Sequence, residues 1–88
     1  MLVADKEVRE MFLEDDVVVI TCEHPVGASE RVYGRVGVVM VTTIDDGKRF
    51  YDVKDITGSE YAYDDSELRD ADWEEIAEAF ITLVKERI

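Results

Sequence analysis

Cys22 and His24 stand on either side of Glu23, and a thiolate and an imidazole at this spacing can bind one metal ion. A structural zinc site takes four such ligands, whereas the whole chain has one cysteine and one histidine. Cys22 also ends a β-branched run, where a small buried side chain is the usual role. We therefore expect no metal site and no cofactor.

Nucleophilic catalysis needs a base beside the nucleophile and a third group that orients the base. His24 is the only histidine, and it precedes Pro25 in a loop-like segment without a glycine-rich oxyanion or phosphate cradle. Paired carboxylates are abundant, but acids on a solvated surface lack the tuning that catalysis requires. We expect that the chain is not an enzyme.

The acidic side chains are gathered in one part of the sequence. Between Glu60 and Glu78, nine acids face a single base, Arg69, whereas the stretch from Val17 to Ser59 has six acids and five bases. The net charge of −12 repels phosphate backbones and anionic lipids, so we expect neither nucleic acid nor a membrane as a partner. The uneven charge favours an electrostatic docking surface for a basic protein, and a merely solubilising face is the plainer interpretation. The candidate partner-binding residues are Asp64, Asp65, Glu67, Asp70, Asp72, Glu74, Glu75, Glu78, Tyr61 and Tyr63.

Two other interpretations of the acidity stay open. An array of carboxylates can imitate the phosphates of DNA or RNA and block the basic cleft of a nuclease, as phage-encoded anti-restriction and anti-CRISPR inhibitors do. Halophilic adaptation would place acids on every face, and the near-neutral middle of the chain weighs against it. We rank a non-enzymatic domain that binds a basic partner protein first and the nucleic-acid mimic second.

Aromatic side chains in the expected strands offer another kind of site. With nearby acids, aromatic rings can enclose a methylated cationic side chain. The more ordinary arrangement places about half of the rings in the core and half on the sheet surface. Tyr61 and Tyr63 are two residues apart, so they share one face of a strand. The aromatic residues concerned are Tyr33, Phe50, Tyr51, Tyr61 and Tyr63.

The remaining pattern predicts a single domain, residues 1–88, that is mainly β with a helix at each end. Apolar residues at helical spacing predict a short helix over 4–14 and a longer one over 72–88. Between them, β-branched runs predict strands, and Asp46-Gly47 predicts a two-residue hairpin turn. The expected strands cover 17–22, 31–33, 38–44, 49–53 and 60–63, and a helical turn is expected over 64–68.

The C-terminal helix carries an apolar stripe in which Trp73, Phe80 and their neighbours recur every three or four residues. We expect this stripe to pack on the domain and to bury Trp73 and Phe80. A docking face for another protein is the alternative.

The segment Gly34-Arg35-Val36-Gly37-Val38-Val39 resembles the glycine-valine pattern of KOW-type domains. The order of strands and turns over residues 16–70 resembles an SH3-like small barrel, which implies about five strands with both helices outside it. KOW-type barrels often contact RNA or the transcription and translation machinery through basic loops. Because the flanks here are acidic, we keep the fold from this resemblance and not the nucleic-acid role.

The N-terminal residues lack a basic start and a long apolar run, so we expect no signal peptide. One cysteine cannot form an internal disulfide, which fits a reducing compartment. The expected location is therefore the cytoplasm, while the sequence does not set the oligomeric state.

Overall fold

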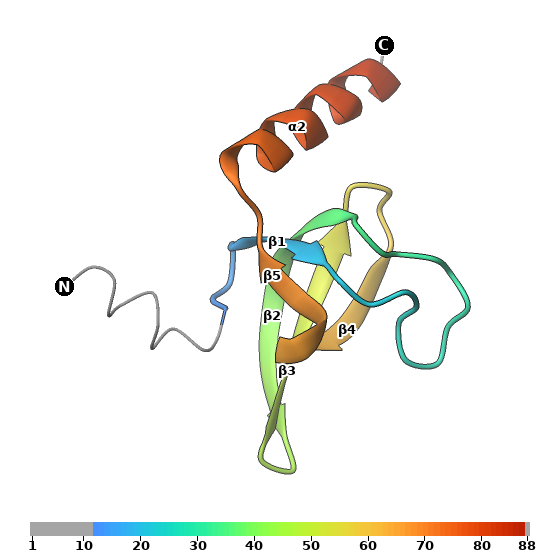
Figure 1. Ribbon diagram of the computed structural model, residues 1–88. Helices are drawn as coiled ribbons and strands as arrows, with labels where there is room; N and C mark the ends of the chain where they lie inside the picture. Colours follow the sequence, from blue (N-terminus) through green and yellow to red (C-terminus); the bar gives the residue numbers. More distant parts are fainter. Residues whose placement is uncertain (1–11, 88) are drawn as a thin grey trace, which may run out of the picture.

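The computed structural model describes residues 12–87, which form a mainly β domain followed by one helix (Figure 1). Five antiparallel strands make one sheet in the order β4-β3-β2-β1-β5. Within the described residues, no pairing joins the edge strands β4 and β5, so the sheet is not closed. The elements are β1 Val17–Ile20, β2 Val36–Asp45, β3 Lys48–Asp55, β4 Glu60–Asp64, the 3-10 helix η1 Asp65–Glu67, β5 Leu68–Asp70 and α2 Trp73–Arg87.

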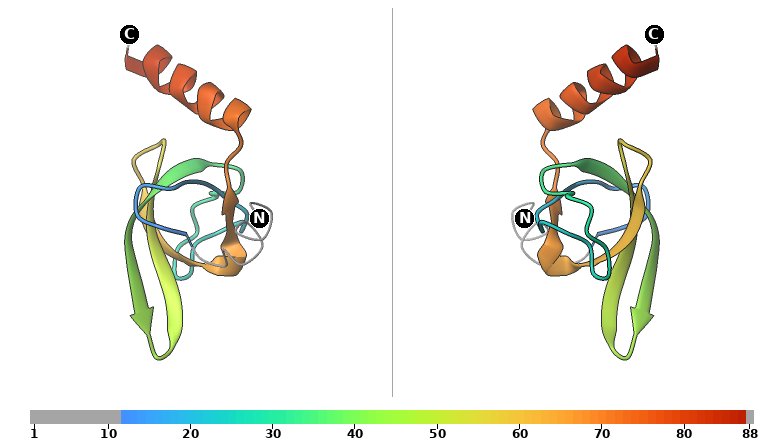
Figure 2. Two further views of the ribbon diagram at one scale, coloured as in Figure 1. Left: turned by 90° about the vertical axis from the view of Figure 1, so that its left-hand side faces the viewer. Right: turned by 90° about the vertical axis from the view of Figure 1, so that its right-hand side faces the viewer.

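The β2–β3 hairpin confirms the predicted turn at Asp46-Gly47. Asp45 pairs with Lys48 across it, and the two turn residues have φ angles of 55° and 77°. Two-residue hairpin turns of this kind need a positive φ at both central positions, which aspartate tolerates and glycine adopts without strain. The outer half of β2 is exposed, and the hairpin extends beyond the rest of the sheet (Figure 2).

The two glycines of the Gly34–Val39 segment have different roles. Gly34 lies in a turn before β2 with a φ of 85°, whereas Gly37 lies within β2. A Cβ atom on Gly37 would stand 2.6 Å from Val53 Cγ1, so only glycine lets β2 approach β3 so closely. Neither glycine marks an irregularity in the pairing of β2 with β3. The register between these strands shifts further along β2, between Val39 and Val41.

The segment between β1 and β2 is irregular, and the expected strand over 31–33 does not form. Backbone hydrogen bonds nevertheless fix its two ends: Val32 N donates to Glu23 O at 2.9 Å, and Gly34 N donates to Ile20 O at 2.8 Å. These bonds hold the segment so that Val32 is buried in the core. The helical turn after β4 is confirmed as η1, but its last residues continue into β5, which pairs with β1 and was not predicted.

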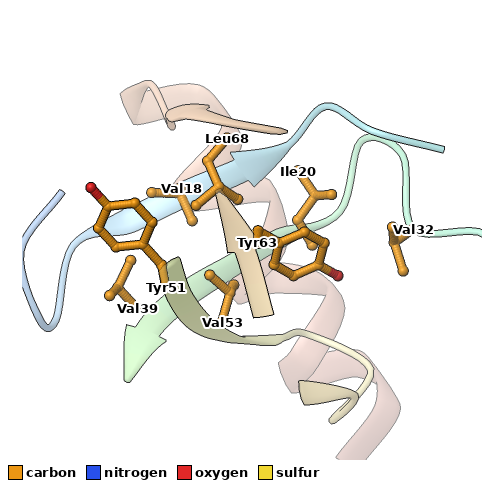
Figure 3. Close-up of a cluster of buried hydrophobic side chains, with 8 residues drawn as sticks. All are labelled: Val18, Ile20, Val32, Val39, Tyr51, Val53, Tyr63 and Leu68. Carbon is orange, nitrogen blue, oxygen red and sulfur yellow. The ribbon is translucent and has the colours of Figure 1, made fainter. Parts of the chain in front are cut away.

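All five strands and the β1–β2 segment contribute side chains to the core, which contains two tyrosine rings among aliphatic side chains (Figure 3). The Tyr51 hydroxyl donates to Asp65 Oδ1 at 2.6 Å and accepts from the Phe12 N–H at 3.2 Å. Among residues 12–87, the buried Tyr63 hydroxyl has no hydrogen-bond partner. The core residues are Val18, Ile20, Val32, Val39, Tyr51, Val53, Tyr63 and Leu68.

The expected N-terminal helix over 4–14 lies mostly outside the described residues. Its last three positions, Phe12 to Glu14, are not helical, and Asp15 follows in a turn with a φ of 75°. Within residues 12–87, no helix is both long and apolar enough to cross a membrane.

The C-terminal helix forms as predicted, but it extends away from the sheet (Figures 1 and 2). Ala79 is its one buried residue among those whose side chains are described. Trp73 is 80% exposed and Phe80 is 66% exposed, so the prediction that both are buried is wrong. The physical reason is that the strands and the β1–β2 segment already complete the core, which leaves no buried position for either ring.

Candidate functional site

The eight acids predicted to bind a partner follow one another from the end of β4 to the second turn of α2, and we call this segment the acidic flank. It contains Asp64, Asp65, Glu67, Asp70, Asp72, Glu74, Glu75 and Glu78. Some of these carboxylates hold the fold together, and others are free. Only carboxylates without such a role have all of their oxygens free to bind a partner.

Two acids of the flank cap η1. Asp64 Oδ1 accepts from Ser66 N at 2.9 Å, and Glu67 Oε1 accepts from Asp64 N at 3.0 Å. This reciprocal arrangement satisfies backbone donors that the short helix leaves unpaired. The Ser66 hydroxyl, with help from the Ser66 N–H and Lys48, lowers the pKa of Asp64, and the Lys48 Nζ atom lies 3.5 Å from Asp64 Oδ2.

Two more acids cap α2 in the same way. Glu75 N donates to Asp72 Oδ1 at 2.8 Å, and Asp72 N donates to Glu75 Oε1 at 2.9 Å. Arg69 on β5 also binds both oxygens of Glu75, at 3.0 and 2.5 Å. The Arg69 guanidinium, then the Asp72 N–H, lower the pKa of Glu75 to about 2.

A fifth acid, Asp65, accepts the hydroxyl hydrogen of Tyr51 and so ties η1 to the core. Within the described residues, the carboxylates of Asp70, Glu74 and Glu78 have no hydrogen bond or ion pair, and all three residues are exposed. Fewer carboxylates of the flank are therefore free to bind a partner than the sequence indicates. The sequence itself indicates these caps, because an acid followed three residues later by glutamate is a capping pattern.

The two predicted tyrosines do not form an exposed aromatic face. Tyr63 is 1% exposed in the core, and Tyr61 is half-buried with its hydroxyl 2.6 Å from Glu30 Oε1. Tyr51 is buried as well, while Phe50 lies under the Lys48 ammonium at 5.8 Å. The rings are thus separated among the core and different surfaces, and the arrangement is not that of an aromatic cage.

A polar cluster that sequence reasoning missed joins the β1–β2 segment to the β3–β4 turn. Asp55, 5% exposed, accepts from Thr57 N at 2.9 Å and from Ser59 N at 3.3 Å. Arg35 Nη1 lies 3.1 Å from Asp55 Oδ2 and 2.7 Å from Glu30 Oε2. No periodic pattern reveals this cluster, because its members are up to 31 positions apart along the chain.

Glu30 is the second centre of this cluster. It accepts from the Tyr61 hydroxyl at 2.6 Å and from the Ser59 hydroxyl at 2.9 Å, in addition to Arg35. The Tyr61 hydroxyl, Arg35 and Ser59 together lower the pKa of Glu30 to about 2, and the charged carboxylate raises the pKa of Tyr61. Every charge here has a partner, so the cluster fastens the loop to the turn and offers no free acid or base.

Cys22 packs against the core, whereas His24 is exposed beside the backbone of the β1–β2 segment. His24 Nδ1 lies 3.1 Å from the Glu30 carbonyl oxygen, and burial, with Glu67 second, raises the pKa of the Cys22 thiol. A raised pKa keeps the thiol protonated and weakly nucleophilic. Among residues 12–87, no three side chains of the metal-binding types gather at one point.

Several exposed apolar side chains lie along one side of α2, and we call this surface the α2 ridge. It consists of Trp73, Ala77, Phe80, Ile81 and Val84, all exposed. Beside it, a groove of about 630 Å³ runs between α2 and β2, with Ile76 and Leu83 on the helix side and Val38 and Met40 on the strand side. Adjoining exposed apolar side chains of this kind are typical of a protein interaction site.

Compared with protein-family models, with curated proteins and with solved structures, the chain matches none of them.

Proposed function

We propose that this chain is a non-enzymatic binding domain that engages a basic partner protein through its acidic flank. The observation that carries the proposal is the group of unpaired, exposed carboxylates at Asp70, Glu74 and Glu78, directly beside the uncovered α2 ridge. Unpaired charges raise the rate at which an oppositely charged partner is captured, and apolar side chains then slow its release. The single cysteine supports the cytoplasm as the place of action.

We further propose that the β domain is an SH3-like small barrel. The supporting features are five strands in the order β4-β3-β2-β1-β5 and a 3-10 turn between β4 and β5. The strong bend of a small barrel would come from β2, which pairs with both β1 and β3 and carries the register shift after Val39. This assignment concerns the scaffold and leaves the binding role to the flank.

The nucleic-acid mimic remains the second candidate, as an inhibitor of a nuclease of the anti-restriction or anti-CRISPR kind. It would need carboxylates in an array that follows the spacing of phosphates. The capping bonds of Asp64, Glu67, Asp72 and Glu75 fix those four carboxylates against the backbone, so the free array is short. For this reason we rank the mimic behind general binding to a basic protein.

The test is a pair of matched charge reversals. One variant changes Asp70, Glu74 and Glu78 to lysine, and the control changes Glu14, Asp45 and Glu60, which are exposed acids outside the flank. Both variants change the net charge equally and leave the capping pairs intact.

The binding measurement uses a partner captured from native lysate and then purified. We expect the flank variant to associate at least tenfold more slowly at low salt, and the difference to shrink as salt screens the charges. The control should associate nearly as fast as the wild type. Equal rates for the two variants would show that the position of the charge is irrelevant and would refute the proposal.

A further inference from the structure

The α2 ridge follows the spacing of a coiled-coil seam. Trp73, Ala77, Phe80 and Val84 are separated by four, three and four residues, which is the alternation of a heptad repeat. At 1.5 Å per residue, the 15 residues of α2 are about 22 Å long, so the seam covers most of the helix. Such a seam is the surface that one helix presents to another helix packed along its length.

The sheet does not cover this seam. Ala79, the buried residue of α2, lies about 130° around the helix from the middle of the seam at 3.6 residues per turn. Ile76 and Leu83 lie between these two directions and border the groove toward β2. The seam therefore faces solvent, and one of its sides continues into an apolar groove.

The other side of the seam is acidic. Glu74 and Glu78 lie there together with Lys85, and within the described residues none of the three has an ion pair. The first two turns of this side are thus negative, and Asp70 adds a free carboxylate just before the helix. A helix placed on the seam would meet apolar groups on one side and unpaired carboxylates on the other.

We infer that the element which binds here is a cationic amphipathic helix of the partner protein, packed lengthwise on the α2 ridge. This inference rests on the proposed function and specifies the part of the partner that is recognised. The partner helix would insert apolar side chains between Trp73, Phe80 and Val84 and place lysine or arginine against Glu74 and Glu78. The positive charge of the partner helix is inferred from the free carboxylates, and its helical form is inferred from the heptad spacing of the ridge.

A second copy of this chain fits the surface less well. In a two-fold antiparallel pair, the same side of both helices lies on one side of the pair, so that side would carry four glutamates, Glu74 and Glu78 of both copies, against two lysines, Lys85 of both copies. A parallel pair would bring the two acidic N-terminal halves together at one end. Both arrangements add like charges to a chain whose net charge is already −12.

Synthetic peptides serve as probes for the test. The first is a helical peptide of lysine and leucine in heptad order, the second is polylysine with the same number of lysines, and the third replaces every lysine of the first with glutamate. Trp73 is the only tryptophan and lies on the seam, so its fluorescence reports burial of the ridge directly. We expect the lysine–leucine peptide alone to shift the emission to the blue with saturation.

Substitutions then locate the binding surface. Phe80→Ser and Val84→Ser should each lower the affinity for the lysine–leucine peptide at least tenfold. The reason is that a few central side chains carry most of the binding energy of an interface. Val26→Ser is the matched control, since Val26 is an apolar side chain 85% exposed in the β1–β2 segment, and its affinity should equal that of the wild type. Far-UV circular dichroism verifies that each variant keeps its helix.

The possible outcomes separate the two proposals. Equal affinity for polylysine and the lysine–leucine peptide, with no change at Trp73, would refute the seam inference and leave electrostatic binding standing. Equal binding of the glutamate–leucine peptide would refute the basic partner itself. Sedimentation showing a dimer at micromolar concentration, with the blue shift already present without peptide, would overturn the inference in favour of self-association.

Discussion

Asp55 holds the polar cluster together, and its removal should be the most damaging single change outside the apolar core. Its side chain is 1% exposed and accepts four hydrogen bonds. Three of them, from Thr57 N, Thr57 Oγ1 and Ser59 N, end on Oδ1, and the fourth, from Arg35, ends on Oδ2. Asp55→Ala removes all four, whereas Asp55→Asn keeps an oxygen for the turn and loses the ion pair with Arg35.

The structure sets the size of each effect. Breaking a buried ion pair by removing one partner costs about 3–5 kcal/mol when the remaining charge stays buried. Arg35 is 24% exposed and keeps Glu30, so part of this cost is relieved by water and by the second carboxylate. We expect Asp55→Ala to lower the free energy of unfolding by about 2–4 kcal/mol, and Asp55→Asn to lower it by about 1–2 kcal/mol.

Urea unfolding followed by far-UV circular dichroism measures both effects. Asp45→Asn is the control, because it makes the same charge change at an exposed residue beside the hairpin turn, and its effect should stay within about 0.5 kcal/mol. In a domain of this size, 1 kcal/mol lowers Tm by about 4–8 °C, so the three variants separate clearly in a thermal scan as well. If Asp55→Ala were as stable as Asp45→Asn, the cluster would contribute nothing and the reasoning would fail.

Three other predictions concern the ridge, β2 and pH. Phe80→Ala should change the free energy of unfolding by less than about 1 kcal/mol in urea, whereas Tyr51→Ala, in the core, should cost about 3–5 kcal/mol. Gly37→Ala, whose Cβ would meet a β3 methyl at 2.6 Å, should cost about 1–3 kcal/mol, and Gly34→Ala, at a φ of 85° in open space, should cost about 1 kcal/mol in the same assay. Because the pKa of Glu30 falls from 4.5 to about 2 on folding, its stabilisation is complete above pH 4.5 and is lost as pH falls through about 2. Urea midpoints measured across that range should decline less steeply in Glu30→Gln, and parallel declines would contradict this.

The local parts of the fold could be predicted from the sequence. Asp46-Gly47 meets the backbone requirement of one turn type, and the β-branched run at Val17 needs no distant partner to be recognised as a strand. The β5 strand could not be predicted in this way. Its three residues have no period of their own and become a strand because β1 pairs with them.

The candidate site was predictable only in part. The sequence shows where the acids are gathered, but which of them are free to bind a partner depends on capping and on contacts such as that of Asp65 with Tyr51. The sequence also could not predict that the Trp73 side of α2 faces solvent. A helical stripe shows that an apolar face exists. Whether that face is buried depends on whether the other elements already complete the core.

The junction between β5 and α2 has a consequence for how a partner would be received. Arg69 reaches past Ala71 and Asp72 to bind Glu75, and this exposed pair braces the helix at its base. An ion pair at the surface contributes little to stability and weakens as salt is added. A partner residue that competes for Arg69 or Glu75 would therefore displace this pair at small cost and reach the first turn of α2 directly.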